Sequence, residues 1–252
     1  MKEIVLITGA TAGFGKACAE KFAENGHDLI LTGRRDDRLQ QLKKRLEIEQ
    51  GIEVLTVSFD VRREKEVNNH LGELPKKWRK VGILINNAGL ASGLDFIQDG
   101  DTDDWDKMID TNVKGLLYVS RAVIPYMIER KKGHIINIGS TAGKEVYPKG
   151  NVYCASKHAV DAITKGMRLD LLEHGIKVTQ IAPGAADTEF STVRFHGDKK
   201  KAKSVYKGYQ PMQAEDIAEV TYYTTTLPKH LCINDVVMTS VAQANSYVFH
   251  KE

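Results

Sequence analysis

The sequence predicts an α/β protein built on a doubly wound parallel sheet with helices on both faces. Short runs rich in Ile, Val and Leu alternate with longer amphipathic segments along most of the 252 residues. Such alternation is typical of parallel strands joined by helical crossovers. The short runs are continuously apolar rather than alternating, which indicates strands that are buried on both faces.

The elements follow in a regular order from the N-terminus. Ile4 to Thr8 predicts a buried strand, and Phe14 to Asn25 predicts a helix that ends at Gly26. Further strands are expected at residues 28–32, 53–58, 83–86, 134–139, 177–181 and 233–238. Further helices are expected at residues 36–50, 63–72, 103–130 (bent near Pro125), 152–173 and 214–226.

No linker, repeat or low-complexity tract interrupts this order. Residues 1–252 are therefore expected to form a single domain for dinucleotide binding and catalysis. Residues 184–210 are polar and Lys-rich, and we expect them to form a substrate loop, because loops of that length often act as lids. Residues 240–252 form a C-terminal tail, which either tucks into its own subunit or reaches a neighbouring one.

Composition narrows the class of protein. The formal net charge is +3, which gives no indication of a nucleic-acid or membrane partner. The three cysteines, Cys18, Cys154 and Cys232, are odd in number and lie far apart. They predict neither a disulfide framework nor a metal site, and they favour a reducing, cytoplasmic location. The start of the chain lacks the pattern of a signal peptide.

A glycine-rich turn lies between the first strand and the first helix. Glycine permits tight turning and lets backbone N–H groups approach a pyrophosphate, to which the helix N-terminus adds partial positive charge. In this position the turn predicts a dinucleotide site of the Rossmann type. The expected cofactor contacts here are Gly9, Ala10, Thr11, Ala12, Gly13, Phe14 and Gly15.

The next segment bears on which dinucleotide is bound. An acid about 20 residues after the turn would bind the adenosine ribose of NAD. Gly33 stands there instead, and Arg34 and Arg35 follow it. Two guanidinium groups suit the 2′-phosphate of NADP. The alternative is that both arginines are merely solvated at a helix start.

Tyr153 and Lys157 are the sharpest catalytic signal. Their spacing of four residues places them on one helix face, one turn apart. An ammonium group near a phenol lowers the tyrosine pKa toward the working range of an acid–base catalyst. Such a pair is usually accidental when it stands alone, so its meaning depends on the residues that accompany it.

Other polar groups follow the ends of neighbouring strands. Ser140 comes just after the fifth expected strand, thirteen residues before Tyr153, and Asn87, Ala88 and Gly89 close the fourth. Ligands of open α/β sheets gather at such strand ends. Asn112 lies inside a helix, where an asparagine is most often simply exposed.

Taken in order, these motifs resemble the catalytic tetrad of the short-chain dehydrogenase/reductase family over nearly the whole chain. The resemblance implies that Tyr153 is the general acid or base and that Ser140 orients the substrate oxygen. It also implies that Lys157 binds the nicotinamide ribose and that Asn112 holds a water molecule. Implied cofactor contacts are Asp60, Val61, Asn87, Ala88, Gly89, Tyr153, Lys157, Pro183, Gly184 and Thr188.

Several segments are similar to one subgroup, the NADP-dependent 3-hydroxy acid dehydrogenases. That subgroup includes serine and allo-threonine dehydrogenases and malonic semialdehyde reductases, and sulfoacetaldehyde reductases are close relatives. The resemblance implies a homotetramer in which the helices near 103–130 and 151–173 pack across subunits. Residues 144–146 and 185–187 depart from the subgroup pattern and are expected near the substrate.

The function expected from these motifs is hydride transfer between NADP(H) and a small 3-hydroxy acid. Arg194 is the expected clamp for the substrate carboxylate, because a guanidinium binds it bidentately, and Tyr147 is expected to add a hydrogen bond. One alternative is a reductase of another small aldehyde, either sulfonated or neutral. A second alternative, from another class, is a catalytically idle NADP-binding sensor or scaffold.

Overall fold

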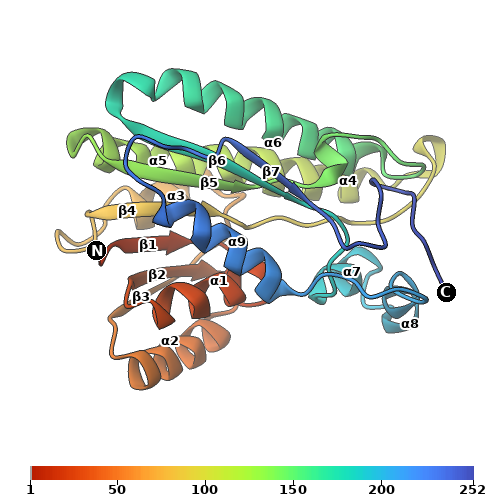
Figure 1. The fold of residues 1–252 in the computed structure, drawn as a ribbon, viewed down its shortest axis with the longest axis horizontal. Coiled ribbons are helices and arrows are strands. Elements are labelled where there is room, and N and C mark those ends of the chain that lie inside the picture. Colours follow the sequence, from red (N-terminus) through yellow and green to blue (C-terminus); the bar gives the residue numbers. More distant parts are fainter. Residues whose placement is uncertain (1) are drawn as a thin grey trace.

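The computed structural model describes residues 2–252 and contains one seven-stranded parallel sheet with the strand order β3-β2-β1-β4-β5-β6-β7 (Figure 1). The predicted doubly wound fold is confirmed. The strands are β1 (Ile4–Ile7), β2 (Asp28–Gly33), β3 (Val54–Ser58), β4 (Val81–Asn86), β5 (Gly133–Ile138), β6 (Ile176–Pro183) and β7 (Asp235–Met238).

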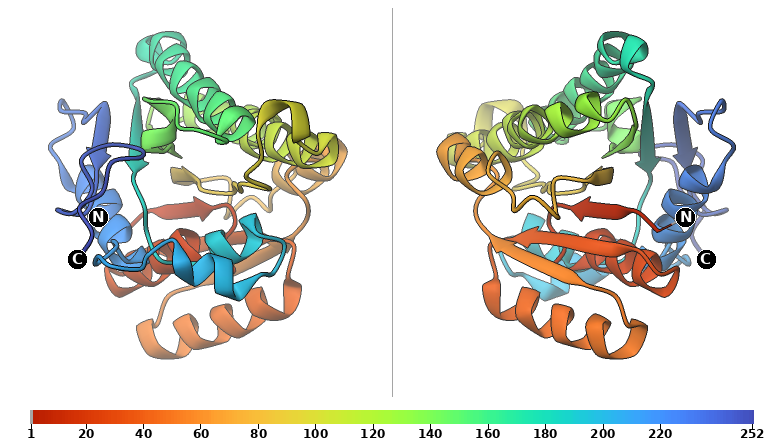
Figure 2. Two further views of the ribbon diagram at one scale, coloured as in Figure 1. Left: turned by 90° about the vertical axis from the view of Figure 1, so that its right-hand side faces the viewer. Right: turned by 90° about the vertical axis from the view of Figure 1, so that its left-hand side faces the viewer.

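Helices cover both faces of this sheet (Figure 2). The main helices are α1 (Gly13–Glu24), α2 (Asp36–Gln50), α3 (Glu64–Leu71), α4 (Thr102–Ile109), α5 (Leu116–Glu129), α6 (Asn151–Asp170) and α9 (Ala214–Thr226). The core cluster on one face takes its helical members from α1, α2 and α9, and the cluster on the other takes them mainly from α3, α5 and α6. No helix within residues 2–252 is long and apolar enough to cross a membrane.

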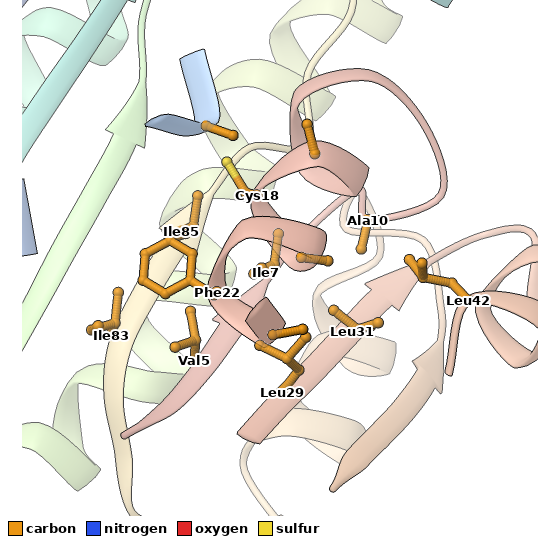
Figure 3. Packing of buried hydrophobic residues seen from close by; sticks show 14 of the residues in the cluster. Val5, Ile7, Ala10, Cys18, Phe22, Leu29, Leu31, Leu42, Ile83 and Ile85 are labelled. Atoms are coloured by element: carbon orange, nitrogen blue, oxygen red, sulfur yellow. The ribbon is translucent and has the colours of Figure 1, made fainter. Parts of the chain in front are cut away.

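Alternate residues of each strand enter opposite layers, which explains why the strand sequences are continuously apolar. In β1, Val5 and Ile7 join the layer of α1, whereas Ile4 and Leu6 join the layer of α5. Figure 3 shows the first layer, in which the Phe22 ring lies among side chains of β1, β2 and β4.

The region predicted as one helix from 103 to 130 is built differently. A π-helical turn, η2 (Asp110–Gly115), separates α4 from α5, and Pro125 is accommodated inside α5. The π turn displaces the backbone hydrogen bonds by one residue, a feature frequently found at functional sites. Amphipathic periodicity could not reveal it, because the side-chain pattern continues through the turn.

Residues 184–210 were expected to form a loop, and they contain two short helices. These are α7 (Glu189–Arg194), capped by Thr188, and α8 (Lys199–Ser204), capped by Asp198. The α8 lysines face solvent. Both helices begin with side-chain caps, which satisfy the first free N–H groups of such short segments.

The C-terminal tail packs against its own chain. Glu252 donates its N–H to the Gly208 carbonyl at 2.8 Å, and Phe249 lies 5.0 Å from Tyr209 between ring centroids. Gln243 is 4% exposed and accepts a 2.8 Å hydrogen bond from the N–H of Ala185. The tail therefore borders the end of β6, beside the region where β1, β4 and β5 also end.

We predict that Phe22→Ala lowers the free energy of unfolding by about 3–5 kcal/mol, because truncating a buried aromatic ring leaves a cavity. Phe22 is fully buried and makes edge contacts with His27 and Tyr222 at 5.5 and 5.3 Å between centroids. Denaturant unfolding measures the loss. Ile48→Ala is the control, since Ile48 is 73% exposed and its truncation should cost about 0.5 kcal/mol or less. Equal losses in the two variants would contradict this account of the core.

Candidate active site

A cleft of about 540 Å³ opens at the carboxyl ends of β1, β4, β5 and β6. This is the point where the strand order changes direction, between β1 and β4, and open α/β sheets bind ligands there. The volume is ordinary for a small-molecule site. The predicted residues that line it are Gly9, Thr11, Ala12, Gly13, Phe14, Arg34, Arg35, Asp60, Val61, Asn87, Ala88, Gly89, Ser140, Tyr147, Tyr153, Lys157, Pro183, Gly184, Thr188 and Arg194.

Three predicted site residues do not line the cleft. Ala10 is fully buried and packs in the core below the turn, where Figure 3 labels it. A Cβ on Gly15 would lie 2.4 Å from both the Gly9 carbonyl oxygen and Asn87 Nδ2, so only glycine fits there. Asn112 is buried behind the cleft. These three residues pack behind the residues that line the cleft.

The glycine turn adopts backbone conformations that favour glycine. Gly9 and Gly13 have φ angles of +67° and +49°. Asn87 Nδ2 donates to the Thr8 and Gly9 carbonyls at 2.8 and 3.3 Å and so fixes the turn to the end of β4. Thr188 lies over the turn, because a Cβ on Gly13 would be 3.5 Å from its Cβ. The segment before α7 therefore crosses the start of α1.

The two arginines after β2 have different surroundings. Arg35 donates from Nε and Nη2 to Thr11 Oγ1 at 3.1 and 2.8 Å, and from Nη1 to Glu189 at 3.0 Å. Arg34 is more exposed, and its nearest acid is Asp60, at 3.9 Å. Asp60 is itself held by Arg62. Burial tends to raise the Asp60 pKa, but the Arg62 contacts outweigh it and lower the pKa overall.

Tyr153 and Lys157 face the cleft from α6, next to the end of β5. Ser140 lies close enough to Tyr153 to lower its pKa, and its Oγ accepts from the N–H of Ala142 at 3.1 Å. Lys157 Nζ donates to the Ile138 carbonyl at 2.9 Å, and burial lowers the Lys157 pKa to about 8. The predicted tyrosine, lysine and serine are thus brought together.

The expected lowering of the Tyr153 pKa does not occur. Burial raises this pKa above its ordinary value, and the neighbouring Tyr147 also raises it. Ser140 and the charge of Arg194 act in the opposite direction but do not outweigh burial. Desolvation of the phenol is therefore stronger than the effect of nearby cations in this closed site.

Asn112 does not have the exposed position typical of a mid-helix asparagine. It lies in the π turn, is 1% exposed, and its Nδ2 donates to the Leu90 carbonyl at 2.8 Å and to Ser156 Oγ at 3.0 Å. Its Oδ1 accepts from the N–H of Leu90 at 2.8 Å. Both amide hydrogens are engaged with protein, so the side chain fixes the irregular segment that follows Gly89.

Arg194 lies beside Tyr153, at the end of α7. Its Nη1 donates to Tyr147 Oη at 3.0 Å and its Nε to the Gly93 carbonyl at 3.2 Å. The guanidinium carbon is 5.5 Å from the centroid of Tyr147 and 5.7 Å from that of Tyr153. The site therefore combines a buried phenol with a half-buried cation whose two contacts leave one nitrogen to bind a ligand.

The two segments that depart from the subgroup pattern differ in position. Ala185 and Ala186 line the cleft, as expected. Lys144 points away from it and pairs with Asp161 at 2.5 Å and with Asp235. The lysine thus joins the loop after Ser140 to α6 and β7, whereas Glu145 accepts from the N–H of Ser246, which lines the cleft. The expectation that residues 144–146 lie near the substrate stays a prediction.

The sequence did not reveal several residues of the cleft. Phe190 packs edge-on against Tyr153 at 5.7 Å between centroids, and Gln243, Ser246 and Phe249 enter from the tail. Glu189 pairs with Arg35 and with Arg38. The position of Arg38 could have been predicted from the sequence, because it lies one helical turn after Arg34 and therefore on the same helix face. The positions of the tail residues could not have been predicted from the sequence, since only the tertiary fold brings them to the cleft.

Comparisons with known proteins agree with this geometry. Residues 3–199 match the family described as short chain dehydrogenase. The chain is 49% identical over 242 residues to the NADP-dependent 3-hydroxy acid dehydrogenase YdfG of Salmonella typhimurium, covering 96% of each protein. It is 48% identical over 245 residues to sulfoacetaldehyde reductase 2 of Chromohalobacter salexigens, covering 97% of this chain and 96% of that protein.

A solved structure, the closed form of serine dehydrogenase complexed with NADP⁺, superposes with a TM-score of 0.92. The two chains are 44% identical, and the match covers 99% of this chain and 100% of that one. The family resemblance expected from the motifs is confirmed by these matches. The chain belongs to the short-chain dehydrogenase family.

Proposed function

We propose that this protein transfers a hydride between NADP(H) and a small 3-hydroxy acid or its oxo form. The observation that carries the proposal is the placement of Arg194 beside Tyr153, which sets an anion-binding group next to a proton donor. The relatives named for 3-hydroxy acid and serine dehydrogenase activity support the same reaction.

The residues that line the cleft suit the two halves of a dinucleotide. At one end the glycine turn precedes α1, whose first N–H groups are free to bind phosphate. Arg34 and Arg35 stand beside that turn and suit a 2′-phosphate. At the other end Lys157, Pro183 and Gly184 would hold the nicotinamide half, where the cofactor supplies or accepts the hydride.

Tyr153 would move the proton at its Oη. Because burial keeps its pKa high, the phenol is protonated at neutral pH, which is the form required to protonate a substrate oxygen during reduction. Ser140 would donate a hydrogen bond to the same oxygen and fix its orientation. Phe190 and the tail residues would exclude water from this end of the cleft.

Arg194 and Tyr147 would bind the acidic end of the substrate. A carboxylate in a partly closed site needs a cation partner, because an unpaired buried charge is costly. The cation lies over the tyrosine rings, which shield it from solvent on one side. A sulfonate has the same charge and similar geometry, so a sulfonated aldehyde is the second candidate substrate, supported by the sulfoacetaldehyde reductase relative.

The proposal extends to the assembly of the protein and to its location in the cell. We propose a homotetramer, which agrees with the exposed apolar side chains of Leu169 in the last turn of α6, of Leu172 just after that helix and of Val237 in β7. We also propose a cytoplasmic location, in keeping with the three unpaired cysteines. The relatives are named as dehydrogenases and a reductase, so the alternative of an idle NADP sensor is not favoured.

Substitution of Arg34 and Arg35 tests their expected role in binding the 2′-phosphate. Arg34→Ala should weaken NADP binding about tenfold, because a charged hydrogen bond contributes roughly 1.5–3 kcal/mol. Arg35→Ala should also weaken it, whereas NAD binding should barely change in either variant. Titration of both cofactors measures this, and an equal loss for NAD and NADP would reject the assignment.

Substitution of Tyr153 tests its expected role in proton transfer. Tyr153→Phe should lower turnover by about 10²–10⁴-fold, since it removes only the hydroxyl group that donates the proton. Cofactor affinity, measured by fluorescence titration, should stay near that of the unmodified protein. Near-normal turnover in Tyr153→Phe would show that another group transfers the proton.

Substitution of Arg194 tests its expected role in binding the acidic end of the substrate. Arg194→Leu should raise the KM for an acidic substrate about ten- to a hundredfold, on the estimate for charged hydrogen bonds. The KM for a neutral aldehyde of similar size should change little, and that aldehyde is the matched control. Equal impairment of both substrates, or of neither, would remove Arg194 from the role of anion clamp.

A further inference from the structure

Glu189 brings a negative charge into the part of the cleft that is richest in arginine. Its carboxylate accepts from Arg35 Nη1 at 3.0 Å and from Arg38 Nη1 at 2.9 and 3.2 Å. Burial tends to raise the Glu189 pKa, but hydrogen bonds from the two arginines outweigh it and lower the pKa overall. The group is therefore a carboxylate at neutral pH, bridging α7 to the start of α2.

This ion pair overlaps the proposed subsite for the 2′-phosphate. All three nitrogens of the Arg35 guanidinium already donate, two to Thr11 and one to Glu189. Arg34 differs, because its guanidinium is 61% exposed and its nearest acid is 3.9 Å away. A phosphate arriving at this end of the cleft would find Arg34 without a close anionic partner and Arg35 already paired with the Glu189 carboxylate.

We propose that Glu189 is a cofactor-specificity residue that competes with the 2′-phosphate of NADP for Arg35 and Arg38. This inference rests on the NADP assignment made above. Two anions cannot share the same guanidinium groups without repulsion, so binding of the phosphate requires Glu189 to withdraw or to weaken its contacts. Glu189 therefore lowers the preference for a 2′-phosphate below what three arginines alone would give.

The position of Glu189 in the fold gives this competition a second consequence. It is the first residue of α7, and the same short helix carries Phe190 against Tyr153 and Arg194 against Tyr147. Release of Glu189 loosens the end of α7 that faces the adenosine half of the cleft. Occupancy of the phosphate subsite is in this way linked to the helix that presents the substrate clamp.

The test uses two fragments that do not require turnover, 2′,5′-ADP and 5′-AMP, each titrated calorimetrically into the full-length protein. Glu189→Gln should tighten binding of 2′,5′-ADP about two- to fivefold, the range expected for an exposed ion pair, and should leave 5′-AMP unchanged. The gain should shrink at high salt, because these side chains are about half exposed.

Two further variants make the result specific. Glu219→Gln removes the same charge from a surface pair with Lys21 outside the cleft, and it should change neither titration. In an Arg38→Gln background, Glu189→Gln should give a smaller gain, because one of the contested guanidinium groups is gone.

Two other results would contradict the inference. If Glu189→Gln leaves the affinity for 2′,5′-ADP unchanged, or weakens both fragments equally, Glu189 does not compete with the phosphate and this inference is wrong. If the unmodified protein binds 2′,5′-ADP no more tightly than 5′-AMP, the NADP assignment itself fails, and the inference fails with it.

Discussion

The parallel sheet fixes the site, because every loop that carries chemistry leaves the sheet at the same edge. The glycine turn follows β1, residues 87–89 follow β4, and Ser140 follows β5. Two side-chain contacts then hold these loops in place. Asn87 joins the glycine turn to the end of β4, and Lys157 joins α6 to the last carbonyl of β5. The position of Tyr153 against the cleft depends on that second contact.

Desolvation sets the electrostatic character of the site. It raises the pKa of Tyr153 and lowers that of Lys157 to about 8, so burial drives both groups toward their neutral forms. Arg194 adds the positive charge of a guanidinium group to this site. It is therefore a cation next to a neutral proton donor, which is the combination that a small anionic carbonyl compound requires.

Local sequence patterns predicted most of the framework, because apolar runs and glycine positions are set by nearby residues. The predicted helices at 36–50 and 214–226 agree with the structure, and so does the predicted succession of strands along the chain. The π turn, the burial of Asn112 and the direction of Lys144 were not predicted, since they depend on tertiary contacts. Glu189 and Gln243 were missed for the same reason: each meets its partners across more than fifty residues of chain.

The central claim is that this site reduces or oxidises a small anionic substrate with NADP(H). The most direct measurement is NADPH oxidation with three aldehydes of similar size, carrying a carboxylate, a sulfonate and no charge. We predict a kcat/KM at least about tenfold higher for one or both anionic aldehydes than for the neutral one, as expected for a charged hydrogen bond. An equal or greater value for the neutral aldehyde, or no oxidation with any of the three, would contradict it.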